Sequence, residues 1–81
     1  MTSFEFIKEL ESNPKEIYLE TTRILLKILE NIIQYPREDR YRTLKLTNPT
    51  VINKLLPVIG AMECLFAIGF SEVIMHLLFF I

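Results

Sequence analysis

The sequence predicts an α/β domain of the α+β type, with helices packed on a small β-sheet of two or three strands. Apolar residues recur at helical spacing through the N-terminal part of the 81-residue chain, whereas segments 41–46 and 77–81 have the patterns of strands. Hydrophobic residues make up 51% of the chain, which favours a packed core over disorder. The length predicts one domain spanning residues 1–81. Because the chain ends on the apolar LLFFI, we expect it to be excised from a longer protein.

Two helices are expected in the N-terminal half. Ser3–Ser12 has apolar residues at every third position and charged residues between them. Asn13-Pro14 then predicts a helix start, with Asn13 as the cap, and Glu16 stands where a capping box has its carboxylate. This second helix should run to about Gln34, because Tyr35-Pro36 disfavours helical backbone. Its broad apolar face makes it the expected spine of the fold.

The segment Tyr41–Gly60 changes period in its middle. YRTLKL alternates as a strand does, which would place Tyr41, Thr43 and Lys45 on one face and the leucines on the other. Asn48-Pro49 repeats the signal of a capped helix start and predicts a short helix over 49–55, before Pro57. A cationic strand that leads into a short helix indicates a surface for binding another molecule.

The last third is expected to be a helix followed by extended chain. Gly60 opens the helix, and Gly69 is the expected left-handed stop, after which Phe70 packs back on the helix. Leu77–Ile81 is expected to be a buried strand that pairs with the Thr43–Leu46 region. Val73–Met75 is expected to be a weaker strand or a turn.

Positive charge is concentrated in the middle of the chain. The net charge is −1, but residues 37–54 contain five basic and two acidic side chains, whereas the segments on either side are acidic. This distribution favours an acidic partner for the middle segment. The alternative that these are ordinary solvated charges stays open.

Catalysis is not indicated. Cys64 and His76 are the only cysteine and histidine, so neither a disulfide nor a tetrahedral zinc site can form within the chain. Cys64 lies among apolar residues, which favours an inert thiol, and His76 is expected in the core or at a strand edge. There is no glycine-rich phosphate loop, and no cofactor is expected. The basic residues lack interleaved aromatics, so we expect no nucleic acid partner. Breaks in the apolar C-terminal segment argue against a membrane span.

Several motifs, in order and without gaps over residues 12–80, resemble the PUB domain, in particular that of cytoplasmic peptide N-glycanase. They are Asn13-Pro14-Lys15-Glu16, Asn31-Ile32 before Pro36, Arg40-Tyr41-Arg42, Leu44–Asn48, Lys54–Val58, Gly60-Ala61, Glu63–Phe66 and Gly69-Phe70. PUB domains also occur in proteins with UBA or UBX domains. The resemblance implies helices packed on a small antiparallel sheet, and a non-catalytic, cytoplasmic adaptor that we expect to be a monomer.

The resemblance also implies a ligand and a site. The ligand is the acidic C-terminal tail of the AAA ATPase valosin-containing protein, which has a leucine–tyrosine near its end. Binding would link a peptide N-glycanase, an amidase, to ER-associated degradation in the ubiquitin–proteasome pathway. The implied peptide-binding residues are Asn31, Arg40, Tyr41, Lys45, Asn48, Val51, Leu56, Pro57 and Gly60. Pro49 and Val51 depart from the family pattern, which commonly has a small polar residue and an aromatic there, so the pocket is expected to be shallower.

Other interpretations remain open at this point. Asn48 could serve only as a helix cap, and Asn31 could bond to the following loop rather than to a ligand. A second hypothesis is a structural module that associates with itself or with a partner helix through apolar surface at its C-terminal end. A third is a thiol enzyme that uses Cys64.

Overall fold

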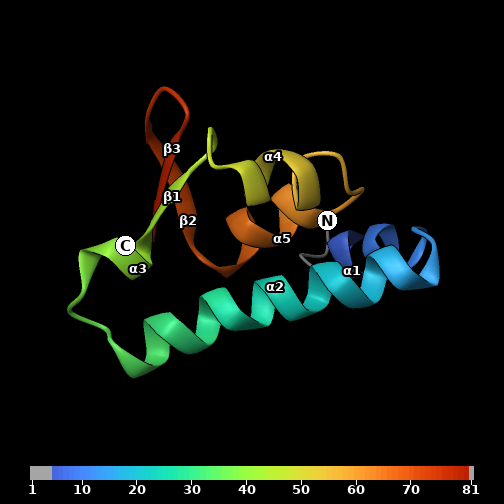
Figure 1. Cartoon of the computed structure of the whole chain (residues 1–81), viewed down its shortest axis with the longest axis horizontal. Helices are drawn as coiled ribbons and strands as arrows, with labels where there is room; N and C mark the ends of the chain where they lie inside the picture. Colours follow the sequence, from blue (N-terminus) through green and yellow to red (C-terminus); the bar gives the residue numbers. More distant parts are fainter. Residues whose placement is uncertain (1–4, 81) are drawn as a thin grey trace.

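The computed structural model describes residues 5–80, which form helices and a three-stranded antiparallel sheet (Figure 1). The elements in chain order are α1 (Glu5–Glu11), α2 (Lys15–Gln34), α3 (Asp39–Arg42), β1 (Thr43–Lys45), α4 (Pro49–Lys54), α5 (Ala61–Ile68), β2 (Phe70–Ile74) and β3 (Leu77–Phe80). The long helix α2 lies along one side of the molecule, and α4, α5 and the sheet lie on the other (Figure 1). The predicted α+β fold is therefore confirmed. The ends of the first predicted helix and of the last predicted strand, Ser3 and Ile81, lie outside the described residues.

The predicted start of α2 is correct in position but not in its cap. Pro14 occupies the cap position, and no side chain caps the helix. Asn13 instead joins two segments: its Nδ2 donates to the carbonyls of Leu10 and Ile59, each at 2.9 Å, and its Oδ1 accepts from the Ile59 amide at 3.3 Å. Since α1 ends at Glu11, two residues before Asn13, the free carbonyls at that end compete for the Asn13 amide. The predicted end of α2 is confirmed at Tyr35, whose amide donates to Asn31 O.

The sheet has the strand order β1-β3-β2, and both pairs are antiparallel. The predicted pairing of the C-terminal strand with the middle segment is confirmed: Thr43, Leu44 and Lys45 lie opposite Phe79, Leu78 and Leu77. This pairing joins segments that are far apart in the sequence.

The prediction that Tyr41 belongs to the strand is wrong. Tyr41 lies in the helical turn α3, and its ring stacks on that of Tyr35 with centroids 5.1 Å apart. Stacking on a residue at the end of α2 favours a turn here, because a strand would carry Tyr41 away from Tyr35. The strand therefore begins only at Thr43.

The β2–β3 hairpin is longer than predicted, because β2 starts directly after Gly69 and continues to Ile74. The turn contains His76 with φ of 62°, a left-handed conformation, and its amide donates to Glu72 Oε2 at 3.3 Å. His76 is exposed, so the core is excluded for it; it lies at the N-terminal end of β3, where its carbonyl accepts from the Leu46 amide at 2.8 Å. The local sequence has no Gly, Pro or Asn at this turn, which is why it gave no clear turn signal.

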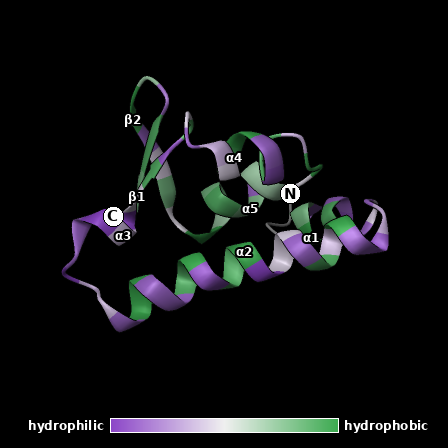
Figure 2. Cartoon of the chain, in the orientation of Figure 1, coloured by the Kyte–Doolittle hydropathy of each residue, from purple (hydrophilic) through white to green (hydrophobic). Residues whose placement is uncertain are grey.

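Helix α5 is central to the core. Hydrophobic residues predominate on α5, whereas α2 alternates between hydrophobic and hydrophilic residues along its length (Figure 2). Three leucines are almost completely buried: Leu65 of α5, Leu78 of β3, and Leu55, which follows α4. Phe70 is also buried, as predicted, and its ring meets that of Phe80 edge-on at 5.6 Å. The site described below lies at the outer edge of this core, where the chain passes from α3 to α4.

Among residues 5–80, no helix is long and apolar enough to cross a membrane.

Candidate functional site

An open depression of about 380 Å³ lies beside β1. It is lined by Asp39, Arg40, Thr43, Leu44, Lys45 and Asn48. The tight turn after β1 brings the last two together, because the Asn48 amide donates to Lys45 O at 3.1 Å. Lys45 and Asn48 therefore face one depression, rather than opposite sides of the molecule.

Asn48 has one side-chain atom engaged and one available. Its Oδ1 accepts from the Thr50 amide at 2.8 Å, so the predicted cap of α4 is confirmed. Among residues 5–80, no hydrogen bond of its Nδ2 is found, and the residue is exposed. An amide Nδ2 can donate two hydrogen bonds. Capping and ligand binding are thus compatible at Asn48.

Asp39 and Arg40 form the side of the depression that belongs to α3. The Arg40 guanidinium lies over the Tyr41 ring, 4.8 Å from its centroid, and Arg40 Nε is 3.5 Å from Glu38 Oε2. The Arg40 side chain is 73% exposed, so the contact with Glu38 is solvated and weak. The half-buried Tyr41 does not line the depression itself but positions Arg40.

The structure separates the remaining predicted residues from this depression. Asn31 lies half-buried on α2, and Leu56 is exposed after α4. Val51 is 2% exposed, so it belongs to the core. Gly60 is buried against α1, where a Cβ would lie 2.9 Å from Leu10 N and from Phe6 O. The Val51 side chain therefore does not reach the surface, and Gly60 has no side chain to present there.

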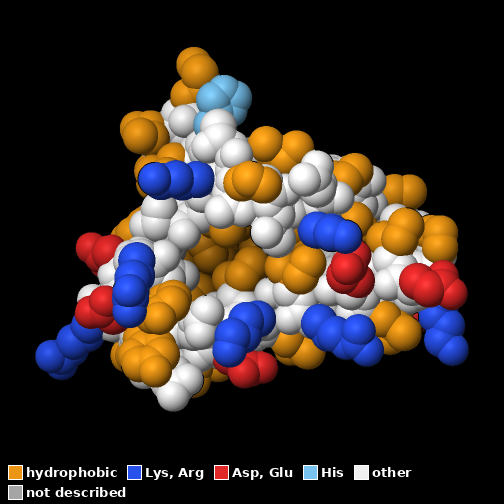
Figure 3. Space-filling model, viewed as in Figure 1, with side chains coloured by type: hydrophobic (Ala, Val, Ile, Leu, Met, Phe, Trp, Pro, Cys, Tyr) orange, Lys and Arg blue, Asp and Glu red, His pale blue; other side chains and the backbone are white. Residues whose placement is uncertain are grey.

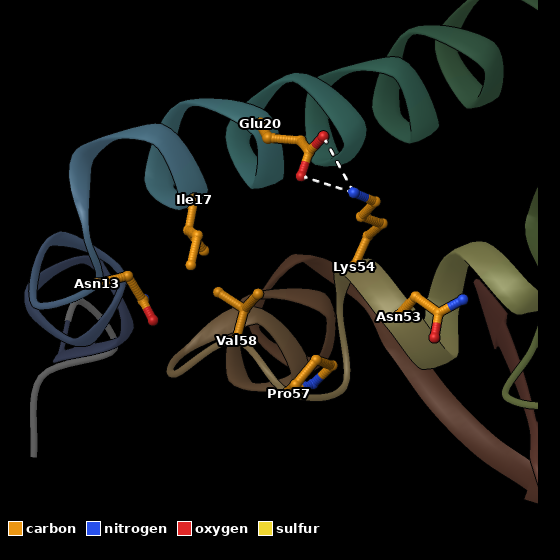
Figure 4. A pocket seen from close by; sticks show the side chains of 7 residues that line it. All are labelled: Asn13, Ile17, Glu20, Asn53, Lys54, Pro57 and Val58. Carbon is orange, nitrogen blue, oxygen red and sulfur yellow. Dashed lines mark hydrogen bonds and ion pairs between the residues drawn. The ribbon is translucent and has the colours of Figure 1, made fainter.

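Pro57 lines a different depression, between α2 and α4 (Figure 4). Lys54 spans it from α4, with its Nζ 3.2 Å from Glu20 Oε1 on α2, and Asn13, Ile17, Asn53 and Val58 complete its lining. The ion pair connects the two helices at their surface. This second depression has one cation, already paired, and so is less suited to an acidic ligand than the depression beside β1.

Three lining residues were not identified from the sequence: Asp39, Thr43 and Leu44. They could have been inferred from the sequence, because each is a close sequence neighbour of Arg40 or Lys45. Arg42 has a structural role: its Nε donates to Phe80 O at 2.9 Å, and its guanidinium lies 4.9 Å from the Phe79 ring centroid. It therefore fastens α3 to β3. On the face seen in Figure 3, Lys and Arg side chains lie over the α3–β1 end with acidic groups beside them, and others lie along α2.

The described residues contain neither an activated thiol nor a cluster of metal ligands. Cys64 is buried, and burial raises the pKa of its thiol. A raised pKa lowers the thiolate fraction at neutral pH, and the thiolate is the nucleophile. Among residues 5–80, no group of three or more His, Cys, Asp or Glu side chains is placed to hold a metal ion.

The fold and the site together define a class of protein: a small α+β domain that presents an open, charged depression at a sheet edge. The PUB domain model matches residues 15–81, and the chain belongs to the PUB domain family. PUB domains are protein-interaction modules and are not catalytic.

Relatives agree with this assignment. The chain is 42% identical over 73 residues to a peptide-N(4)-(N-acetyl-beta-glucosaminyl)asparagine amidase of Gallus gallus and 41% identical over 73 residues to that of Homo sapiens. Each match covers 90% of this chain but 11% of the amidase. A UBX domain-containing protein 6 of Caenorhabditis elegans is 34% identical over 62 residues, which is 76% of this chain and 14% of that protein. The chain thus spans about a tenth of the amidases it resembles, and their activity is that of much longer proteins.

Proposed function

We propose that this domain binds the acidic C-terminal tail of the AAA ATPase valosin-containing protein. The observation that supports the proposal most strongly is the shared position of Arg40, Lys45 and Asn48 in one open depression. Two cations and an unpaired amide donor suit an acidic, extended chain terminus.

Each group has a distinct part in the proposal. The exposed Lys45 ammonium pairs with a tail carboxylate, Arg40 supplies a second cation, and Asn48 Nδ2 donates to a peptide carbonyl or carboxylate. Asn31, Leu56 and Pro57 do not line this depression, so we propose no direct contact between them and the bound end of the tail. Val51 and Gly60 support the site from the core. A short peptide buries less than about 1,200 Å², so we expect micromolar affinity.

The proposal extends to the biology of the parent protein. The relatives in Gallus gallus and Homo sapiens are amidases, and we propose that this domain belongs to a cytoplasmic protein of that kind. As a monomeric adaptor, it would bring the amidase to the ATPase during disposal of misfolded glycoproteins.

Two substitutions at Asn48 test the proposal. Asn48→Asp keeps the Oδ1 cap of α4 but replaces the Nδ2 donor with a negative charge, so the fold should remain stable while tail affinity falls at least about tenfold. Asn48→Ala removes both and should also cost about 1 kcal/mol of stability. Chemical shifts during titration of a synthetic tail peptide give the affinity, and urea unfolding gives the stability.

Asn48→Ser is the uncharged control for Asn48→Asp, since a serine keeps the cap of α4 but has no amide and adds no negative charge. Equal tail affinity for all three variants and the wild type would exclude Asn48 as a contact. Titration shifts that are absent from residues 40–60 would exclude this site altogether.

The second candidate function, self-association, is favoured by one observation. The β2–β3 hairpin exposes Val73, Ile74 and Met75, which are 49%, 66% and 80% exposed. Light scattering distinguishes the candidates: a stable dimer without tail affinity would favour self-association over the adaptor.

A further inference from the structure

Strand β1 is one of the two edge strands of the sheet, and the register identifies which of its backbone groups point outward. The Leu46 amide donates to His76 O at 2.8 Å, and His76 continues the register in which Leu44 lies opposite Leu78. Antiparallel pairs alternate between bonded and non-bonded positions. Leu44 therefore bonds to β3, whereas the peptide groups of Thr43 and Lys45 point away from it.

One of these outward groups is already used. Lys45 O accepts the Asn48 amide at 3.1 Å, which confirms that it points away from β3. Thr43 C=O and Lys45 N–H remain as an acceptor and a donor two residues apart. The depression beside β1 is lined by Thr43, Leu44 and Lys45, so this edge of β1 borders open space.

We propose that an acidic peptide binds by adding a strand parallel to β1, with one peptide residue bonded between Thr43 C=O and Lys45 N–H. In a parallel pair, one residue donates to the carbonyl before its neighbour and accepts from the amide after it. An antiparallel strand would need the amide and the carbonyl of the same residue. The Lys45 carbonyl is already bonded to Asn48, and antiparallel pairing at Thr43 alone would leave the Lys45 amide unused. The inference rests on the proposed function and adds the mode and direction of binding.

The direction agrees with the charges around β1. A parallel peptide runs from α3 toward Asn48, so its C-terminal carboxylate arrives near the Lys45 ammonium and Asn48 Nδ2. Acidic residues that precede the terminus then lie near Arg40 of α3.

The other edge of the sheet is less suited to this peptide. Strand β2 is interrupted by a register shift between Glu72 and Ile74, and a shift of this kind disrupts the regular spacing of backbone groups. Glu72 also places a negative charge on that strand. An acidic peptide should therefore add at β1 and not at β2.

Hydrogen exchange measured residue by residue by NMR tests the mode on the unmodified 81-residue chain. The probe is a synthetic acidic tail peptide with a free C-terminus and leucine–tyrosine near its end. At saturation, exchange of the Lys45 amide should slow at least about tenfold, while the Leu44 amide, already bonded to β3, should change little. Amides of β2 serve as the internal control and should not gain protection.

A scan of the peptide by N-methylation tests the single bonded residue without altering the protein. N-methylation at one position, the residue whose N–H donates to Thr43 C=O, should weaken binding at least about tenfold. Methylation of either neighbour, whose N–H points away from β1, should change the affinity by less than about threefold.

A paramagnetic label at either end of the peptide tests the direction. A label at the N-terminal end should broaden amides of α3, and one at the C-terminal end should broaden those near Asn48. Reversed labels, an unchanged Lys45 amide or a flat methylation scan, each in a peptide that still binds, would overturn strand addition and leave the proposed function intact. Absence of any binding by the peptide would overturn both.

Discussion

Gly60 is a residue whose backbone, rather than any side chain, determines its importance. Its φ is 87°, and a Cβ at this position would lie 2.9 Å from Leu10 N and from Phe6 O. Both atoms belong to the backbone of α1 and cannot move aside as a flexible side chain does. Gly60 thus allows α5 to pack closely on α1.

Gly60→Ala should lower the free energy of unfolding by about 2–4 kcal/mol, because alanine brings both left-handed strain and steric overlap. Urea unfolding followed by circular dichroism measures the change. Asn53→Ala, at an exposed position of α4, is the control and should stay within about 0.5 kcal/mol of the wild type. A Gly60→Ala variant as stable as the control would show that α1 does not pack here as described.

Cys64 gives a second test at the residue scale. Burial raises the pKa of its thiol, so the thiolate fraction at neutral pH is smaller than that of an exposed cysteine. Iodoacetamide should therefore alkylate the native chain much more slowly than the urea-unfolded chain, as followed by mass spectrometry. Fast alkylation of the folded chain would revive the thiol-enzyme hypothesis.

At the scale of elements, prediction from sequence succeeded where a segment carries its own signal. The apolar stripe and proline-flanked ends of α2 are local features, as is the Asn48-Pro49 start of α4, and both helices lie where expected. The prediction that Tyr41 lies in the strand was wrong because its ring stacks on Tyr35, a contact that alternation within YRTLKL cannot reveal. The cap of α2 failed because Asn13 bonds to Ile59, 46 residues away.

For the candidate site, too, the sequence predicts neighbouring residues better than distant ones. Arg40, Lys45 and Asn48 lie within a short stretch of chain, and the turn after β1 keeps them together. Whether a more distant residue reaches the same surface depends on packing. Val51 is on the buried side of α4, and Pro57 lines the depression beside α2, neither of which follows from sequence spacing.

The β2–β3 hairpin offers a test of one element. His76 has φ of 62°, a conformation that asparagine accepts readily and a β-branched residue does not. His76→Val should lower the free energy of unfolding by about 1–2 kcal/mol, whereas His76→Asn should change it little. Thermal unfolding of both variants measures the difference. Equal stabilities would mean that the turn adopts another conformation.

At the scale of the whole molecule, the net charge is −1, although the middle segment is cationic. A short-range field from Arg40 and Lys45 should matter more to an acidic peptide than the net charge, because salt screens exposed charges beyond about 10 Å at 0.1 M ionic strength. Position should therefore decide the effect of a charge reversal, since each reversal changes the net charge equally.

Lys45→Glu and Lys27→Glu separate these two effects. Lys45 lines the depression beside β1, whereas Lys27 is exposed on α2. We expect Lys45→Glu to weaken binding of the acidic tail peptide at least about tenfold at low salt, and Lys27→Glu by less than about twofold. Titration calorimetry at several salt concentrations measures both. Because the Lys45 contribution is electrostatic, the gap between the variants should narrow as salt rises. Equal losses in the two variants would mean that the peptide responds to net charge and not to this site.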